Sequence, residues 1–153
     1  MSKLQTVLQQ QIAPGVYRFP SRASLATLQA EAEEAGWQLF YLDGATFHDK
    51  AGFLAAAKDA FDMPNYVGNN WDAFEEAIND LSWAPAAGYA VVFDDAAGLD
   101  DGDPAAFATA VDILSTTAQN WQQEGKPFYA LIRGAGRVES DLPPWPDSLS
   151  DPA

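Results

Sequence analysis

Cysteine is missing from this sequence of 153 residues, and only one histidine, His48, is present. The absence of cysteine excludes a disulfide framework, a thiolate nucleophile and a cysteine-type zinc site. The serine-nucleophile motif Gly-x-Ser-x-Gly, the phosphate loop, Gly-x-Gly-x-x-Gly and His-Glu-x-x-His are also missing. These absences exclude the enzyme classes that depend on those motifs and leave no indication of a cofactor, and we interpret His48 as a surface or turn residue.

Long apolar runs are missing as well. No run approaches the roughly 20 residues of a membrane-spanning helix, and residues 1–15 lack the apolar core of a signal peptide. Together with the lack of cysteine, these features predict a cytoplasmic protein that does not associate with membranes.

Positive charge is scarce. The chain has 8 Lys and Arg against 22 Asp and Glu, a net charge of −14, and no Lys or Arg occurs between Asp59 and Glu124, a window that holds 13 of the acids. Such a chain is repelled by nucleic acid and by anionic membranes. The window is either a solvated surface that keeps the protein soluble or a face that binds a cationic partner.

The residues that are present suit one α/β domain with a packed core, because 48% are hydrophobic and 12% aromatic. Strands are expected at 15–19, 37–42, 89–93 and 128–132. Helices are expected at 23–35, from the cap Asp49 to before Pro64, at 71–81 and at 104–124, with loops at 64–70 and 94–103. The resulting β-α-β-α-α-β-α-β order predicts a mostly parallel sheet of three to four strands with helical crossovers.

Paired carboxylates are the candidate functional groups. Asp72 and Glu76 lie four residues apart on the expected helix, so they project from one face and could serve hydrolysis, hold a metal or imitate two phosphates. The acids between Asp94 and Asp103 could bind a divalent cation, but they lack the spacing of a calcium loop, and a solvated loop with Asp103 as a helix cap explains them.

The stretch Met63-Pro64-Asn65-Tyr66-Val67-Gly68-Asn69-Asn70-Trp71-Asp72-Ala73-Phe74 resembles the signature of the barstar family of ribonuclease inhibitors. The resemblance extends from Tyr41-Leu42-Asp43-Gly44 through the apolar runs at 91–93 and 128–132, and covers about residues 38–134. It implies a small parallel sheet packed by helices. It also implies an inhibitor that blocks the active site of a microbial ribonuclease with an acidic helix and the loop before it.

The resemblance assigns a partner-binding role to eight positions: Tyr66, Val67, Gly68, Asn70, Trp71, Asp72, Glu75 and Glu76. Tyr66 is expected to be an aromatic anchor, and Gly68 to allow close approach or a positive φ. Asp72 and Glu76 are expected to take the place of RNA phosphates. Four of the positions also have a structural explanation: Tyr66 and Trp71 as core residues, Gly68 as a turn and Asn70 as a helix cap.

This chain departs from the family pattern at four places. Glu76 replaces an aspartate, Val67 a tyrosine, Glu75 a tryptophan and Asn120 an acid, and these differences favour a target other than barnase. The implied domain plan is a flexible segment 1–14, a β-α extension 15–37, the barstar-like domain 38–134 and a Pro/Asp-rich tail 135–153. We expect a free monomer that binds a basic ribonuclease or related toxin. The alternative is an interaction module of the same fold whose basic partner is not a nuclease.

Overall fold

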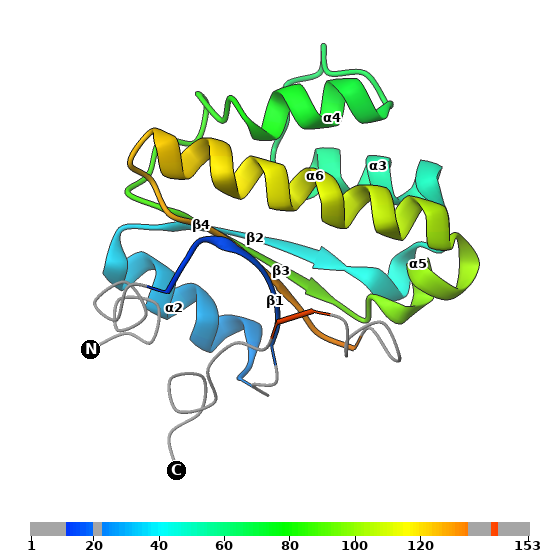
Figure 1. Ribbon diagram of the computed structural model, residues 1–153, viewed down its shortest axis with the longest axis horizontal. Coiled ribbons are helices and arrows are strands. Elements are labelled where there is room, and N and C mark those ends of the chain that lie inside the picture. Colours follow the sequence, from blue (N-terminus) through cyan, green and yellow to red (C-terminus); the bar gives the residue numbers. More distant parts are fainter. Residues whose placement is uncertain (1–11, 20–22, 135–141, 144–153) are drawn as a thin grey trace.

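The computed structural model describes residues 12–19, 23–134 and 142–143 (Figure 1). Its strands are β1 (Gly15–Arg18), β2 (Gln38–Asp43), β3 (Tyr89–Asp94) and β4 (Phe128–Ile132). Its helices are α2 (Leu25–Ala35), α3 (Lys50–Ala60), α4 (Trp71–Ile78), α5 (Ala97–Gly102) and α6 (Pro104–Gln123), with the 3-10 turn η1 at Gly44–Thr46. The expected alternation of strands and helices is confirmed, with α5 as an addition.

The four strands form one parallel sheet in the order β1-β4-β3-β2. The central strand β4 is buried at every position, and β3 is buried at all but its last residue, Asp94. Their unbroken apolar runs follow from this position, because a strand covered on both faces needs apolar side chains throughout. β1 pairs with β4, placing Gly15 opposite Tyr129 and Arg18 opposite Ile132. The N-terminal strand therefore extends the sheet, as expected.

Helices cover both faces of the sheet, so the molecule has three layers (Figure 1). On one face, α3, α4 and α6 enclose the larger apolar core, which includes Phe53 and Phe93. On the other face, α2 packs Leu28 into a smaller core with Trp37 and Tyr129, whose stacked rings have centroids 5.8 Å apart. The N-terminal strand-helix unit thus buries apolar surface on the face opposite α4.

Polar caps determine where the long helices begin. Ser24, Asp49, Asn70 and Asp103 each accept a hydrogen bond from the backbone N–H three residues further along. At the other end of α2, Gly36 adopts a left-handed φ of +78°, which satisfies the last carbonyls of the helix at no steric cost.

The structure differs most from the expected elements at two places. The stretch 94–103, expected as a loop, contains α5, which begins without a side-chain cap and is held by the buried Ala96 and Leu99. α4 ends at Ile78 rather than at 80 or 81, because Leu81 has a φ of +45°, which cannot continue a right-handed helix.

Most of the segments expected to be flexible or extended, 1–14 and 135–153, lie outside the described residues. The described parts contact the fold: Leu142 packs against the larger core, and the Arg18 N–H donates to the Pro143 carbonyl at 2.9 Å. Among the described residues, no helix is both long and apolar enough to cross a membrane.

Candidate functional site: an acidic loop and helix

The candidate site lies on the loop-helix segment (residues 64–80), which follows α3. Val67 anchors its loop in the core, with 8% of its surface exposed, and its N–H donates to the Pro64 carbonyl at 3.0 Å. Asn70 begins α4 by accepting a hydrogen bond from the Ala73 N–H at 2.8 Å. Tyr66, directly before Val67 in the loop, projects outward. At 83% exposed, it is the only exposed large apolar side chain in the part of the chain that the structure describes.

Asp72 and Glu76 are both exposed on α4, one turn apart. Neither carboxylate forms a hydrogen bond or an ion pair with another described residue. Asp72 lies in the first turn of the helix, where the backbone dipole favours an anion. Both carboxylates therefore keep their full capacity to accept hydrogen bonds from a partner.

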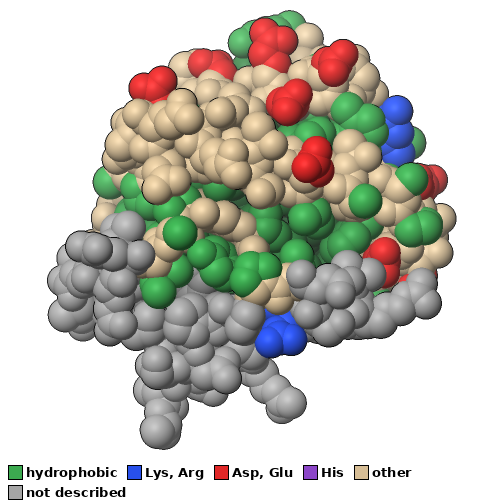
Figure 2. Space-filling view, in the orientation of Figure 1, with side chains coloured by type: hydrophobic (Ala, Val, Ile, Leu, Met, Phe, Trp, Pro, Cys, Tyr) green, Lys and Arg blue, Asp and Glu red, His purple; other side chains and the backbone are tan. Residues whose placement is uncertain are grey.

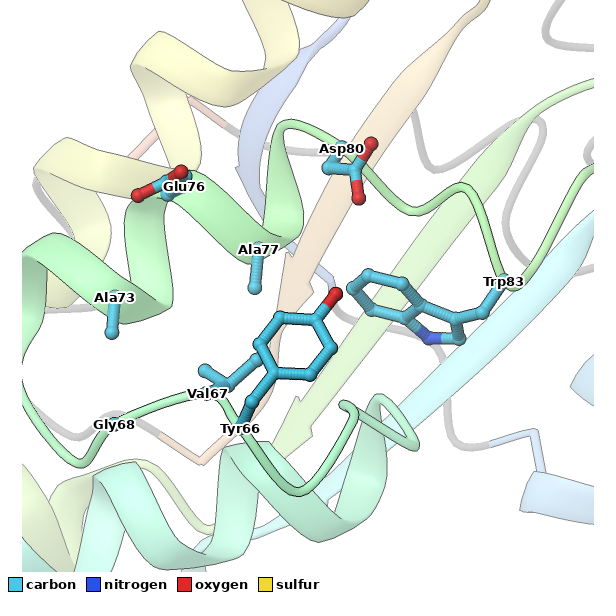
Figure 3. A pocket seen from close by; sticks show the side chains of 8 residues that line it. All are labelled: Tyr66, Val67, Gly68, Ala73, Glu76, Ala77, Asp80 and Trp83. Atoms are coloured by element: carbon cyan, nitrogen blue, oxygen red, sulfur yellow. The ribbon is translucent and has the colours of Figure 1, made fainter.

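A cleft of about 350 Å³ lies between the loop and α4. Its lining is Tyr66, Val67, Gly68, Ala73, Glu76, Ala77, Asp80 and Trp83. Figure 3 shows the Tyr66 ring reaching from the loop toward Trp83, while Ala73 and Ala77 point from α4 toward the loop. The two small alanines leave room for the cleft, and the carboxylates of Glu76 and Asp80 stand on the α4 side of it. The cleft thus combines aromatic surface with negative charge, a combination that suits a cationic side chain.

The two charged residues that line the cleft, Glu76 and Asp80, are both acidic. Figure 2 shows acidic side chains gathered over the upper part of the face in view, where α4 and α6 lie, and basic side chains at its right edge and below. This distribution agrees with the absence of Lys and Arg between Asp59 and Glu124. The helical part of the loop-helix segment, which carries Asp72, Glu75 and Glu76, therefore presents negative charge.

The C-terminal end of α4 is fastened to α6. The Asn79 amide nitrogen donates to the Glu75 carbonyl at 2.7 Å and to Thr117 Oγ1 at 3.1 Å, and Asn79 Oδ1 accepts from Asn120 at 2.8 Å. The Trp121 indole N–H donates to the Ile78 carbonyl at 2.9 Å. These bonds hold the end of the short helix in place, and Asn120 has a structural role in them.

The eight predicted positions do not form a single surface. Tyr66, Val67, Gly68 and Glu76 line the cleft, with Val67 as a buried support. Trp71 is half-buried against Phe53, with ring centroids 5.7 Å apart, so much of its surface serves the core. Gly68 does not have the positive φ that was one of its two expected roles. An added Cβ there would lie 3.1 Å from Asn70 Nδ2, so the glycine gives the capping amide room.

Four residues of the cleft were not among the predicted positions: Ala73, Ala77, Asp80 and Trp83. Asp80 continues the four-residue spacing of Asp72 and Glu76, a signal that could have identified it. Trp83 carries no periodic signal because it follows the helix. Its indole N–H donates to the Phe61 carbonyl at 2.9 Å, which fixes the ring beside the loop.

Two of the carboxylates between Asp94 and Asp103, those at the two ends of the stretch, have partners inside the fold. Arg133 donates to Asp94 through Nε at 2.5 Å and through Nη2 at 2.9 Å, and the Tyr41 hydroxyl donates to the same carboxylate at 2.8 Å. Asp103 caps α6 and accepts from the Lys50 N–H at 3.1 Å. Among the residues that the structure describes, no group of three acidic or histidine side chains could hold a metal ion. His48 is exposed, as expected.

The contacts of Asp94 shift two pKa values. Burial by itself raises the pKa of the Asp94 carboxyl, but the hydrogen bonds from Arg133 and Tyr41 and the charge of Arg133 outweigh it, so the pKa lies below its usual value. Burial, with the hydrogen bond to Asp94 and the charge of that carboxylate, raises the pKa of Tyr41 to about 12. Asp94 is therefore an ionised structural carboxylate at neutral pH.

The comparisons with known proteins agree with this geometry. The family model described as barstar (barnase inhibitor) matches residues 37–133, a range that holds all eight predicted positions and the whole loop-helix segment. The match leaves out β1 and α2, and no curated protein matches the chain. Because the matched range is well over half of the chain and contains β2 through β4, the chain belongs to the barstar (barnase inhibitor) family.

Proposed function

We propose that this protein is an inhibitor that binds a basic ribonuclease, or a related toxin, in the cytoplasm and blocks its active site with the loop-helix segment. The family supports the general class, because barstar-type proteins are ribonuclease inhibitors and not enzymes. Binding is one to one, and the loop-helix segment occupies the groove in which the ribonuclease would otherwise hold RNA.

The observation that carries this proposal is the pair of exposed carboxylates, Asp72 and Glu76, beside a cleft marked by the exposed ring of Tyr66. Neither carboxylate has an internal partner among the described residues. Like charges one turn apart destabilise a helix by a few tenths of a kcal/mol. A binding partner of opposite charge would replace this destabilising repulsion with a favourable attraction.

Complementary chemistry explains how the segment would inhibit. A ribonuclease must bind the phosphates of RNA with positive groups. Asp72 and Glu76 present negative charge at one-turn spacing to the same groups, and Tyr66 adds apolar contact. Charge-assisted bonds that lose their water at the centre of an interface are where binding energy concentrates.

The negative potential of this face would also speed association. A basic partner is attracted before contact, so the association rate is high at low salt and decreases as ionic strength shortens the screening length to about 10 Å at 0.1 M. The dissociation rate depends on short-range contacts and should change less with salt.

The test is binding and inhibition with barnase and other small basic microbial ribonucleases, comparing wild type with the double variant Asp72→Ala/Glu76→Ala. We expect the variant to lose at least about 100-fold in affinity, since each position would act as a hot spot. The matched control is Glu33→Ala/Glu34→Ala, which removes the same charge from exposed positions of α2 on the opposite face of the sheet.

Two outcomes would contradict the proposal. If the Asp72/Glu76 variant binds a ribonuclease as tightly as wild type does, the binding site must lie elsewhere on the protein. Capture of a basic partner without nuclease activity, and no inhibition of any ribonuclease, would favour the interaction-module alternative.

A further inference from the structure

We infer that Lys58 is a positioning residue for the binding loop: its ammonium group holds the backbone of residues 64–70 in the shape that presents Tyr66. Lys58 lies in the last turn of α3. Its Nζ donates to the Val67 carbonyl at 2.8 Å and to the Asn65 carbonyl at 3.2 Å. The backbone carbonyl of the same residue accepts from the Met63 N–H at 2.9 Å, so Lys58 holds the chain at three points.

These bonds matter because the loop has little other support. Clefts flank it on both sides: the cleft against α4, and a second hollow of about 380 Å³ on the α3 side, which Lys58 itself lines. Between the ends of the loop, the buried Val67 side chain and the bond from the Val67 N–H to the Pro64 carbonyl are its other anchors. Hydrogen bonds from a charged donor are roughly twice as strong as neutral ones.

The two bonds also orient the peptide planes. The peptides are trans, so each N–H points opposite to the carbonyl of its own plane. With the Asn65 and Val67 carbonyls turned to Lys58, the N–H groups of Tyr66 and Gly68 face the other way, and neither donates to another described residue. Lys58 therefore determines which edge of the loop offers backbone donors.

Lys58 is a positively charged residue in an acidic part of the protein. The next basic residue along the chain lies beyond Glu124, and the hollow that Lys58 lines also includes Asp59 and Asp62. A lysine placed on the surface for solubility would not direct its ammonium group to two carbonyls of one loop. Its long stem spans the distance from α3 to the loop, and its head satisfies backbone oxygens that regular secondary structure does not.

The consequence for binding rests on the proposed function of the loop-helix segment. A loop already held in its bound shape loses less conformational entropy when a partner binds, and the benefit is seen mainly in slower dissociation. Removing the Lys58 ammonium group leaves the acidic face intact, so electrostatic attraction and the association rate should be preserved.

The first experiment uses the free protein and needs no partner. Residue-resolved amide hydrogen exchange is compared between wild type, Lys58→Met and Lys50→Met, a control that removes an exposed lysine from the other end of α3. We expect Lys58→Met to speed exchange at the Val67 and Met63 amides about tenfold, with the amides of β3 and β4 unchanged. Equal loss of protection in the loop and the central strands, or no change in the loop, would overturn the inference.

A second variant separates the hydrogen bonds from the packing of the stem. Lys58→Arg keeps a cationic donor, so its loop amides should exchange more slowly than those of Lys58→Met. Equally fast exchange in both variants would show that the cation is not the cause and would also overturn the inference.

The binding arm uses barnase as the probe. We expect Lys58→Met to dissociate about tenfold faster than wild type with an association rate within about twofold. If wild type does not bind barnase, that result counts against barnase as the target, while the exchange data still decide the role of Lys58. A slower association rate with unchanged dissociation would contradict positioning.

Discussion

Asp94 and Asp72 have the same side chain, yet the fold treats them in opposite ways. Asp94 lies at the end of β3 and receives hydrogen bonds from Tyr41 of β2 and from Arg133, which follows β4. Asp72 lies at the start of α4, exposed and without a side-chain partner among the described residues. The comparison separates carboxylates that hold the molecule together from carboxylates that are left available. In an acidic chain, position in the fold therefore says more about function than net charge does.

The partnered region also ties the extra N-terminal unit to the family fold. Arg133 Nη1 donates to the Ala23 carbonyl at 2.8 Å, just before α2, and the guanidinium carbon lies 5.8 Å from the centre of the Phe19 ring. One side chain thus connects β4, the end of β3 and the segment between β1 and α2. In the loop-helix segment the backbone is held in place, whereas the carboxylates of Asp72 and Glu76 have no partner among the described residues.

The largest expected effect is a loss of stability when the Asp94–Arg133 pair is broken. Arg133→Met should lower the free energy of unfolding by about 3 kcal/mol, because it leaves a half-buried carboxylate without its cation and removes the bond to Ala23. Urea denaturation followed by tryptophan fluorescence measures this as a lower midpoint with an unchanged slope. Lys50→Met, which removes an exposed cation, serves as the control and should stay within about 0.5 kcal/mol of wild type. An unaltered midpoint for Arg133→Met would remove the energetic basis of the comparison.

A smaller effect on stability is expected when the pH is lowered. A carboxyl whose folded-state pKa lies below its unfolded value stabilises the fold above the unfolded pKa, and this contribution is lost as the pH falls through the folded value. The pKa of Asp94 is lowered in this way, so wild type should lose stability below about pH 4 more steeply than Asp94→Asn does. Urea midpoints at pH 7, 4 and 3 test this. Parallel curves for the two proteins would mean that the Asp94 contact adds nothing that depends on pH.

Much of the fold could be predicted from local patterns. The apolar runs of β3 and β4 identified buried parallel strands, and the caps Asp49, Asn70 and Asp103 begin their helices as expected. α5 was missed because it is short, lacks a side-chain cap and depends on burial of Leu99. The place of β1 beside β4 could not be predicted, because a strand's own sequence does not record its neighbour.

The candidate site was predictable where it is local and missed where it depends on distant contacts. The motif around Tyr66 and Asp72 lies within one stretch, so the resemblance could identify it. The role of Lys58 depends on the reach of a long side chain to carbonyls seven and nine residues away. The Asp94–Arg133 pair joins residues 39 apart in the chain. Such pairings follow from the assembled fold and leave no periodic signal in the sequence.

The smallest expected effect completes the comparison. Asp72→Asn/Glu76→Gln keeps the size of both side chains and removes their charge. Loss of the repulsion between the two carboxylates should stabilise the folded variant by a few tenths of a kcal/mol. Loss of a negative group near the helix N-terminus should destabilise it by a similar amount. The free energy of unfolding should therefore stay within about 0.5 kcal/mol of wild type, measured by urea denaturation at low salt. A drop of 2 kcal/mol or more would show that these carboxylates support the fold as Asp94 does, and the distinction between held and available acids would fail.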